Sequence, residues 1–202
     1  MKKANKKANA AIIIIGNEIL SGRTQDVNVV SISKWLNKLG VKVEEVRTIP
    51  DLEDSIVKTI NDVKKKFKYI FTTGGIGPTH DDITSRSMAK AFKLSYGYHK
   101  EAYKILEKYY GTEKFNEGRK KMAKLPAKAL LINNPSSTAP GFLVDNVYCL
   151  PGVPSILKSM LGELNSKIVG GKKILSKTIN LKTIESEIAL PLEKIQKEFN
   201  NT

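Results

Sequence analysis

Segments typical of strands and helices alternate three times in the first half of this chain, and that order constrains the fold more than any other feature. Short apolar runs typical of buried strands lie at residues 10–15, 41–47 and 68–72. The segments that follow them place apolar residues at helical spacing, at 26–39, 52–67 and 82–92. Repeated strand–helix–strand order favours a parallel sheet with right-handed crossovers, and therefore an α/β fold.

The second half departs from this order. Residues 99–128 predict two short helices around Gly111 that cap one end of the sheet. A strand at 129–132, a hairpin of strands 142–144 and 147–150, and a helix ending near residue 164 follow. A further strand at 173–181 and helix at 185–199 come last. We expect a disordered basic tail at 1–9, one domain over 10–168, and a strand–helix extension over 169–202 that forms an incomplete subdomain.

Composition excludes several classes of protein. The chain has 202 residues, of which 41% are hydrophobic and 27% charged, as in ordinary globular proteins. No apolar run approaches the roughly 18–20 residues of a membrane span, and the run at 10–15 is too short for a secretory signal. The single cysteine, Cys149, excludes an intrachain disulfide, and its apolar neighbours indicate a buried packing residue. We therefore expect a cytoplasmic protein with no membrane partner.

The formal net charge of +14 raises the question of nucleic-acid binding. Four lysines lie in the first ten residues, and lysine pairs and triplets elsewhere fall on predicted helix faces. Such clusters are usually solvated surface. No helix-turn-helix, zinc-finger or aromatic RNA-binding pattern accompanies them, so the sequence does not favour a nucleic-acid partner.

The stretch from Thr72 to Thr84 carries the strongest chemical signal. Gly74, Gly75 and Gly77 follow a predicted strand, and glycine lets the backbone turn tightly and approach a ligand closely. Two adjacent carboxylates, Asp81 and Asp82, come next, at the predicted start of a helix. They could serve as helix caps. One cap explains one aspartate, however, and the pair is better interpreted as hard oxygen ligands for a divalent cation beside a phosphate site.

Other loops that follow predicted strands also carry polar and glycine residues. Because ligands of open α/β sheets bind beyond the carboxyl ends of the strands, we expect these loops to meet at one rim. The candidate substrate-binding residues are Gly16, Asn17, Glu18, Asp26, Asn28, Thr73, Gly74, Gly75, Gly77, Pro78, Thr79, Ser137, Thr138, Gly141, Pro151 and Gly152.

Four motifs in order resemble a known family. Gly16 to Asn28, the glycine–aspartate stretch, Thr138-Ala-Pro-Gly-Phe142 and Leu150-Pro-Gly-Val-Pro154 look like the CinA amino-terminal domain of the MoaB/Mog molybdopterin-binding superfamily. Ile-Ile-Ile-Ile-Gly-Asn-Glu-Ile-Leu with Gly-Pro-Thr-His-Asp-Asp-Ile-Thr resembles most closely the molybdopterin-binding-like domain of FAD synthases. The likeness covers about residues 10–200.

The resemblance implies a three-layer α/β/α sandwich with a mostly parallel sheet, in a homo-oligomer such as a dimer or trimer. It implies a nucleotide or pterin ligand, and hydrolysis of ADP-ribose or FAD supported by a divalent metal such as cobalt or magnesium and by potassium. Asp51 and Asp82 match the two carboxylates regarded as catalytic, and Asp81 replaces a residue that is commonly basic in the Mog branch. The carboxyl-terminal amidohydrolase domain of CinA and the adenylyltransferase domain of FAD synthase have no counterpart in these motifs.

The resulting hypothesis is a metal-dependent nucleotide-diphosphate pyrophosphatase. Its catalytic residues are Asp82 and Asp51, and its metal ligands are Asp81 and Asp82. Two alternatives stay open, namely molybdopterin binding or adenylylation, and a non-catalytic ligand-binding scaffold.

Overall fold

A computed structural model describes residues 8–171, 175 and 177–199 of the chain. Its centre is a six-stranded sheet. The strand order is β2 (Lys42–Ile49), β1 (Asn9–Ile15), β3 (Tyr69–Thr73), β8 (Val147–Leu150), β7 (Gly141–Val144) and β6 (Leu130–Ile132). The first four strands pair in parallel, whereas β6 and β7 join as an antiparallel edge. The predicted mostly parallel α/β sheet is confirmed.

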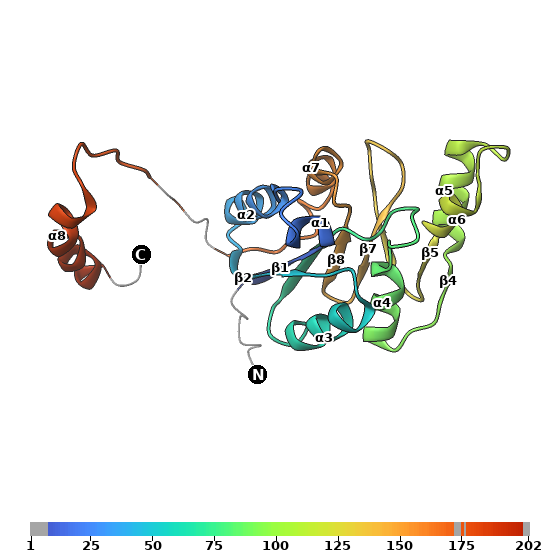
Figure 1. Cartoon of the computed structure of the whole chain (residues 1–202), viewed down its shortest axis with the longest axis horizontal. Coiled ribbons are helices and arrows are strands. Elements are labelled where there is room, and N and C mark those ends of the chain that lie inside the picture. The colour runs from blue at the N-terminus through green and yellow to red at the C-terminus, as the bar shows by residue number, and fades with distance from the viewer. Residues whose placement is uncertain (1–7, 172–174, 176, 200–202) are drawn as a thin grey trace.

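Helices cover both faces of the sheet and complete a three-layer sandwich (Figure 1). On one face lie α2 (Asn28–Lys38) and α7 (Pro154–Glu163). On the other lie α3 (Glu53–Val63) and α4 (Thr84–Phe92). Each layer has its own apolar core, with Ile32 and Leu157 in one and Ile56 and Met88 in the other.

Strand β1 shows why this apolar run lies at the centre. Ile13 and Ile15 pack into the core beneath α3 and α4, while Ile12 packs into the core beneath α2 and α7. Side chains alternate between the faces of a strand, so an uninterrupted apolar run suits a strand covered on both sides.

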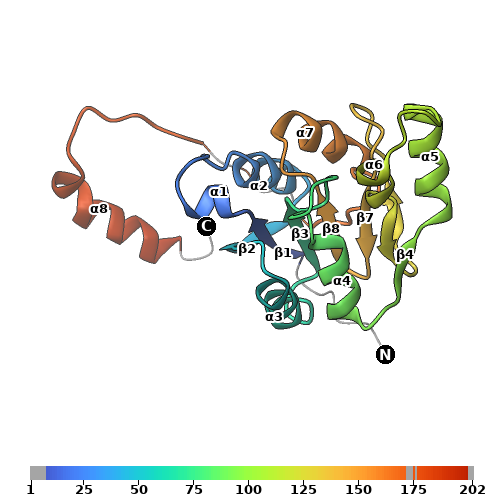
Figure 2. The same ribbon diagram turned by 45° about the vertical axis from the view of Figure 1, so that its right-hand side comes forward.

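Residues 96–126 form an appendage at one end of the sheet (Figure 2). Strands β4 (Tyr96–Tyr98) and β5 (Lys124–Pro126) pair antiparallel as a separate two-stranded sheet. Between them lie α5 (Lys100–Tyr110) and α6 (Glu117–Lys121), and Gly111 ends α5 with a φ of 73°. The two helices around Gly111 are confirmed. The β4–β5 pair was not predicted, because three-residue strands leave too few positions for an alternating pattern.

Several predicted boundaries differ from the structure. The short helix α1 (Asn17–Leu20) was not predicted, and α4 begins at Thr84 rather than at Asp82. The strand expected over 173–181 is wrong for its described residues, 175 and 177–181, which form no strand. The helix expected after it is present as α8 (Glu185–Glu198), which lies apart from the sheet in Figures 1 and 2. The basic tail lies outside the described residues up to residue 7, and Asn9 already belongs to β1.

Candidate functional site

A cavity of about 710 Å³ lies beyond the carboxyl ends of β1, β3 and β8. Ile15 ends β1, the glycine loop follows β3, and Pro151 and Gly152 follow β8. The lining residues are Ile15, Glu18, Thr24, Asp51, Gly74, Gly75, Ile76, Gly77, Pro78, Asp81, Asp82, Tyr110, Arg119, Met122, Asn134, Ser137, Ala139, Pro140, Pro151, Gly152, Val153 and Ile156. Its position is the one at which open α/β sheets bind ligands.

The glycine turn depends on the lack of a side chain at two positions. Gly74 has a φ of 100°, and a Cβ there would lie 2.2 Å from the Ile15 carbonyl oxygen. Gly75 has a φ of 68°, and a Cβ there would lie 2.2 Å from Thr84 Oγ1. Thr84 secures the turn, because its backbone N–H donates to the Gly75 carbonyl at 2.9 Å and its hydroxyl to the Gly74 carbonyl at 3.0 Å. The sharp turn therefore leads the chain from β3 into the loop that lines the cavity.

Asp81 and Asp82 are held by Thr79 within their own loop. Asp82 Oδ2 accepts hydrogen bonds from the Thr79 backbone N–H at 2.8 Å and from its hydroxyl at 2.5 Å. Asp81 Oδ1 lies 2.6 Å from the same hydroxyl, and this hydrogen bond holds the pKa of Asp81 below its usual value. Neither aspartate caps α4, whose first residue is Thr84. The cap interpretation is thus excluded for both, and Gly77 leaves the space that the Asp82 carboxylate fills.

Asp51 approaches the same cavity from the loop after β2. Its Oδ2 accepts a hydrogen bond from the Asn17 backbone N–H at 2.7 Å. Burial raises the pKa of Asp51, the Asn17 hydrogen bond opposes that rise, and the negative charges of Glu18, Asp81 and Asp82 add to it. Four carboxylates, Glu18, Asp51, Asp81 and Asp82, therefore line one cavity, and the other three disfavour the charged form of Asp51.

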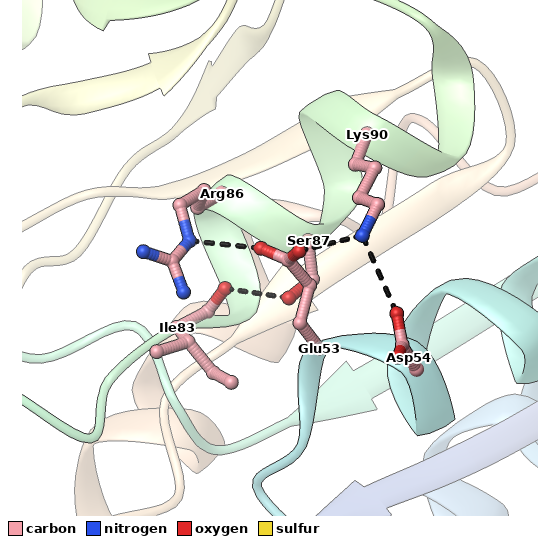
Figure 3. Close-up of polar contacts among 6 residues, drawn as sticks. All are labelled: Glu53, Asp54, Ile83, Arg86, Ser87 and Lys90. Carbon is pink, nitrogen blue, oxygen red and sulfur yellow. Dashed lines mark hydrogen bonds and ion pairs between the residues drawn. The ribbon is translucent and has the colours of Figure 1, made fainter.

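A network of ion pairs joins α3, which follows the loop of Asp51, to α4, which follows the loop of Asp81 and Asp82 (Figure 3). Glu53 at the start of α3 binds Arg86 at 2.9 Å and Lys90 at 2.7 Å, both on α4. Lys90 also lies 3.3 Å from Asp54. The network fixes α3, just after Asp51, against α4, just after the aspartate pair.

The late loops complete the cavity wall. Asn134 is buried, and its Oδ1 accepts hydrogen bonds from the backbone N–H groups of Ser136 and Ser137 at 3.0 and 3.1 Å. Its Nδ2 donates to the Ser137 hydroxyl and to the Ala139 carbonyl, both at 2.8 Å. One side chain thus shapes the turn that presents Ser137 to the cavity.

Comparisons with known proteins identify the architecture around this cavity. The family model described as "Probable molybdopterin binding domain" matches residues 11–170. The chain belongs to this molybdopterin-binding domain family. A CinA-like protein of Fusobacterium nucleatum is 36% identical over 152 residues, which are 75% of this chain and 38% of that protein. The predicted CinA and MoaB/Mog resemblance is therefore confirmed, while the closer likeness to FAD synthases stays a prediction.

Solved structures agree with this assignment. CinA from Thermoplasma acidophilum, a protein of unknown function, superposes with a TM-score of 0.75 at 32% identity, over 80% of this chain and 98% of that one. MoaB from Pyrococcus furiosus, a tungsten cofactor synthesizing protein, gives 0.52 at 22% identity over 82% and 94%, which shows a common fold. The chain spans only part of its curated relatives, from 38% of the Fusobacterium protein to 77% of a Saccharolobus islandicus protein.

Within this family fold, eleven of the predicted site residues line the cavity. They are Glu18, Asp51, Gly74, Gly75, Gly77, Pro78, Asp81, Asp82, Ser137, Pro151 and Gly152.

The other eight predicted residues are not among those that line the cavity. Gly16 leaves room for the Glu18 carboxylate, and Asn17 donates to Asp51. Asp26 accepts the Val29 N–H at 2.9 Å at the start of α2, and Thr79 holds the aspartate pair.

Four further predicted residues have structural contacts of their own. Asn28 donates to the Gly152 carbonyl at 2.8 Å. Thr73 is buried in β3, and the Thr138 N–H donates to the Asn134 carbonyl at 3.1 Å. Gly141 avoids a clash with the Cys149 carbonyl in the β7–β8 pair.

Sequence reasoning missed the contribution of the appendage. Tyr110, Arg119 and Met122 line the cavity although they lie far from the strand-end loops in sequence. Asn134 was also missed as an individual residue, although asparagine after a strand and before Pro-Ser-Ser is typical of a turn organised by its side chain.

The acidic residues suit a loosely held divalent cation better than a closed metal cage. Within the described part of the chain, no group of three or more His, Cys, Asp or Glu side chains is arranged to hold a metal ion. Magnesium commonly uses one or two protein carboxylates and completes its shell with water and substrate phosphates. Asp81 and Asp82, joined through Thr79, meet that smaller requirement.

No helix in the described residues has the length and apolar character of a membrane span.

Proposed function

We propose that this chain is a metal-dependent pyrophosphatase that cleaves a nucleotide diphosphate such as ADP-ribose or FAD. The observation that carries the proposal is the cluster of four carboxylates, Glu18, Asp51, Asp81 and Asp82, in one cavity with a glycine turn. A diphosphate alone would be repelled by such a cluster, whereas a diphosphate accompanied by a divalent cation would be attracted.

The glycine loop would bind the diphosphate through its backbone. The Gly74 N–H is excluded from this role, because it donates to the Leu150 carbonyl at 3.1 Å. The N–H groups of residues 75–77 are the ones assigned to the phosphate oxygens. Ser137, presented by Asn134, supplies a hydroxyl, whereas the Thr79 hydroxyl is engaged by the two aspartates.

The carboxylates would divide two tasks. Asp81 and Asp82 would hold a divalent ion such as magnesium or cobalt, which supplies charge neutralisation and activation of water. Asp51 would accept the proton from the attacking water, a role for which a raised pKa suits a carboxylate. The volume of the cavity lies in the range that accommodates a nucleotide, and its apolar side chains Ile76, Val153 and Ile156 suit a planar base.

Hydrolysis is tested directly by AMP release. Purified protein would be incubated with ADP-ribose or FAD, with magnesium, with cobalt, and with a chelator, in potassium-containing buffer. We expect metal-dependent AMP formation that Asp82→Asn reduces by about 100-fold or more. Asp54→Asn, a change of the same kind on the exposed start of α3, should retain activity. No AMP above the Asp82→Asn background would exclude the proposal.

Molybdopterin binding or adenylylation is the second candidate, and the family model and the MoaB-like fold favour it. Tight binding of a pterin without hydrolysis of either nucleotide would support this function. Ligand binding without turnover of any of these compounds would support a non-catalytic scaffold. We further propose that the protein acts as a homo-oligomer, a dimer or trimer, which light scattering of the purified protein would test.

A further inference from the structure

The appendage contributes one cationic side chain, Arg119, to a cavity that is lined by four carboxylates. Tyr110 at the end of α5 and Arg119 in α6 both line it. Arg119 is the one basic side chain among the lining residues in the described part of the chain, where it faces a cavity shared by four carboxylates. The appendage is therefore part of the site as well as a cap on the sheet.

Helix α6 packs directly against the glycine–aspartate loop. Lys121 Nζ donates a hydrogen bond to the Thr79 carbonyl. A Cβ built on Gly118 would lie 3.4 Å from the Pro78 carbonyl oxygen, so the helix backbone comes close to the turn. Arg119, the next residue, is thereby placed beside the segment to which we assign diphosphate binding.

The guanidinium of Arg119 is held in place by neighbours that leave most of its hydrogen-bonding capacity free. Its Cζ lies 4.1 Å from the centroid of the Tyr110 ring. Its Nη1 donates to the Lys114 carbonyl. A guanidinium has five N–H donors in a rigid fork, so one such bond leaves several for a ligand.

The acidic side chains of the cavity do not neutralise Arg119. None of the ion pairs between described residues involves Arg119 and a carboxylate. A half-buried, oriented cation in a concave site, without an anionic partner from the protein, is suited to an anion from solution.

We propose that Arg119 binds a phosphate group of the ligand and that Tyr110 positions its guanidinium for this contact. This inference rests on the proposed function, since it assigns the phosphate-bearing part of that substrate to a residue of the appendage. Asp81 and Asp82, which would hold the cation, line the same cavity as Arg119, so both kinds of group could contact one diphosphate. Arginine is better suited than lysine here, because its planar fork can bind two oxygens of one phosphate.

Inorganic pyrophosphate is the probe that tests this subsite without requiring turnover. Its binding to the full chain would be measured by calorimetry in the presence of magnesium. We expect Arg119→Gln to raise the dissociation constant roughly 10- to 100-fold, as for loss of a charge-assisted hydrogen bond. Arg119→Lys should recover part of the loss. Lys120→Gln, which removes a neighbouring cation bound to Glu117 at 2.8 Å, should bind like the parent protein.

The Tyr110 variants separate positioning from folding. Tyr110→Phe retains the ring and should bind pyrophosphate normally, whereas Tyr110→Ala should weaken binding while Arg119 is still present. Circular dichroism and thermal unfolding of each variant would establish that α5 and α6 are intact. Equal binding by the parent and a folded Arg119→Gln variant would overturn the proposal, as would no pyrophosphate binding by the parent.

Failure of the Arg119 phosphate subsite can be distinguished from failure of the proposed hydrolysis. If the parent protein binds pyrophosphate through Arg119 but releases no AMP from ADP-ribose or FAD, the hydrolase proposal fails and the phosphate subsite stands. If hydrolysis occurs and Arg119→Gln changes neither pyrophosphate binding nor KM, the subsite proposal fails alone. With both correct, Arg119→Gln should raise KM by a factor similar to the loss of pyrophosphate affinity.

Discussion

Asn28 and Gly152 are joined across 124 positions of sequence by a 2.8 Å hydrogen bond from the Asn28 side chain to the Gly152 carbonyl. Asn28 opens α2 and is only 4% exposed, whereas Gly152 belongs to the loop after β8 and lines the cavity. Helix α2 therefore fixes the loop after β8, which forms part of the cavity wall.

Replacing this side chain should weaken both the fold and the cavity. We expect Asn28→Ala to lower the free energy of unfolding by about 1–3 kcal/mol, because a buried hydrogen bond is lost and its packing space is emptied. Asn37→Ala, at an exposed position of the same helix, should change stability by less than about 0.5 kcal/mol. Urea unfolding of the two variants makes the comparison. Equal stability of Asn28→Ala and the parent would show that the Gly152 contact contributes nothing.

The turn after β3 should tolerate no side chain at Gly75. Gly75→Ala combines a left-handed backbone with a clash against Thr84 Oγ1, and should cost more than about 2 kcal/mol. Gly22→Ala is the matched control, because Gly22 has a similar φ of 71° but no atom within 4 Å of the new Cβ. The difference in unfolding free energy between the two variants measures the clash. Variants of equal stability would show that the loop relaxes around the new methyl group.

The part of the site that follows the regular strands was predictable from local pattern. An apolar run such as residues 10–15 has few alternatives to a buried central strand, and glycines after a strand mark a tight turn. Once three such strands are parallel, their carboxyl ends share one rim. The sequence alone therefore predicts that Glu18, Asp51 and Gly74 lie near one another.

The remainder depended on tertiary contacts that local pattern does not encode. Asp81 and Asp82 have high propensity for helix starts, but Thr79 captures both carboxylates and α4 begins two residues later. Arg119 and Tyr110 could not be assigned to the cavity, because their place depends on how α6 packs against the loop carrying Thr79. The strand expected over 173–181 is wrong for its described residues, 175 and 177–181, for a related reason: β-propensity needs a neighbouring strand or a packed face to be realised.

Cys149 should be chemically inert in the folded protein. It is fully buried in β8, and burial raises the pKa of its thiol to about 12, so little thiolate exists at neutral pH. A disulfide reagent such as DTNB should modify it at least ~100-fold more slowly in buffer than in concentrated urea. Rapid modification of the native protein would contradict the burial of this strand.

Glu53 should stabilise the protein at neutral pH and lose that effect in acid. Hydrogen bonding to Lys90 is the main cause that lowers its pKa in the folded state, so its contribution is present above the unfolded value and is lost as pH falls through the folded one. Because the network is solvent-exposed, Glu53→Gln should cost at most about 1 kcal/mol at pH 7. The difference from the parent should begin to shrink as pH falls below the unfolded value near ~4.3, and it should vanish below the lowered folded pKa. Thermal unfolding across this range tests it, and a pH-independent difference would assign the effect to packing.

The contribution of Asp51 to the free energy of unfolding should change with pH in the opposite direction. Burial raises its pKa, so the folded state binds the proton more tightly than the unfolded state does. The unfolding free energy therefore falls as pH rises from the unfolded value near ~3.9 through the folded one, and a penalty remains at pH 7. Asp51→Asn should remove that penalty while its amide oxygen still accepts the Asn17 N–H. We expect a Tm higher by about 1 °C or more at pH 7 in chelator, and no gain below pH ~4.

The same substitution should abolish hydrolysis, because asparagine cannot accept a proton from water at neutral pH. Asp81→Asn provides the contrast. Its pKa is lowered by the Thr79 hydroxyl, so removing its charge should not raise Tm. We expect Asp51→Asn to be more stable but inactive, and Asp81→Asn not to be stabilised. This pair of results would identify Asp51 as the carboxylate whose charge destabilises the folded state. A lower Tm for Asp51→Asn at pH 7 would instead show that its charge stabilises the fold.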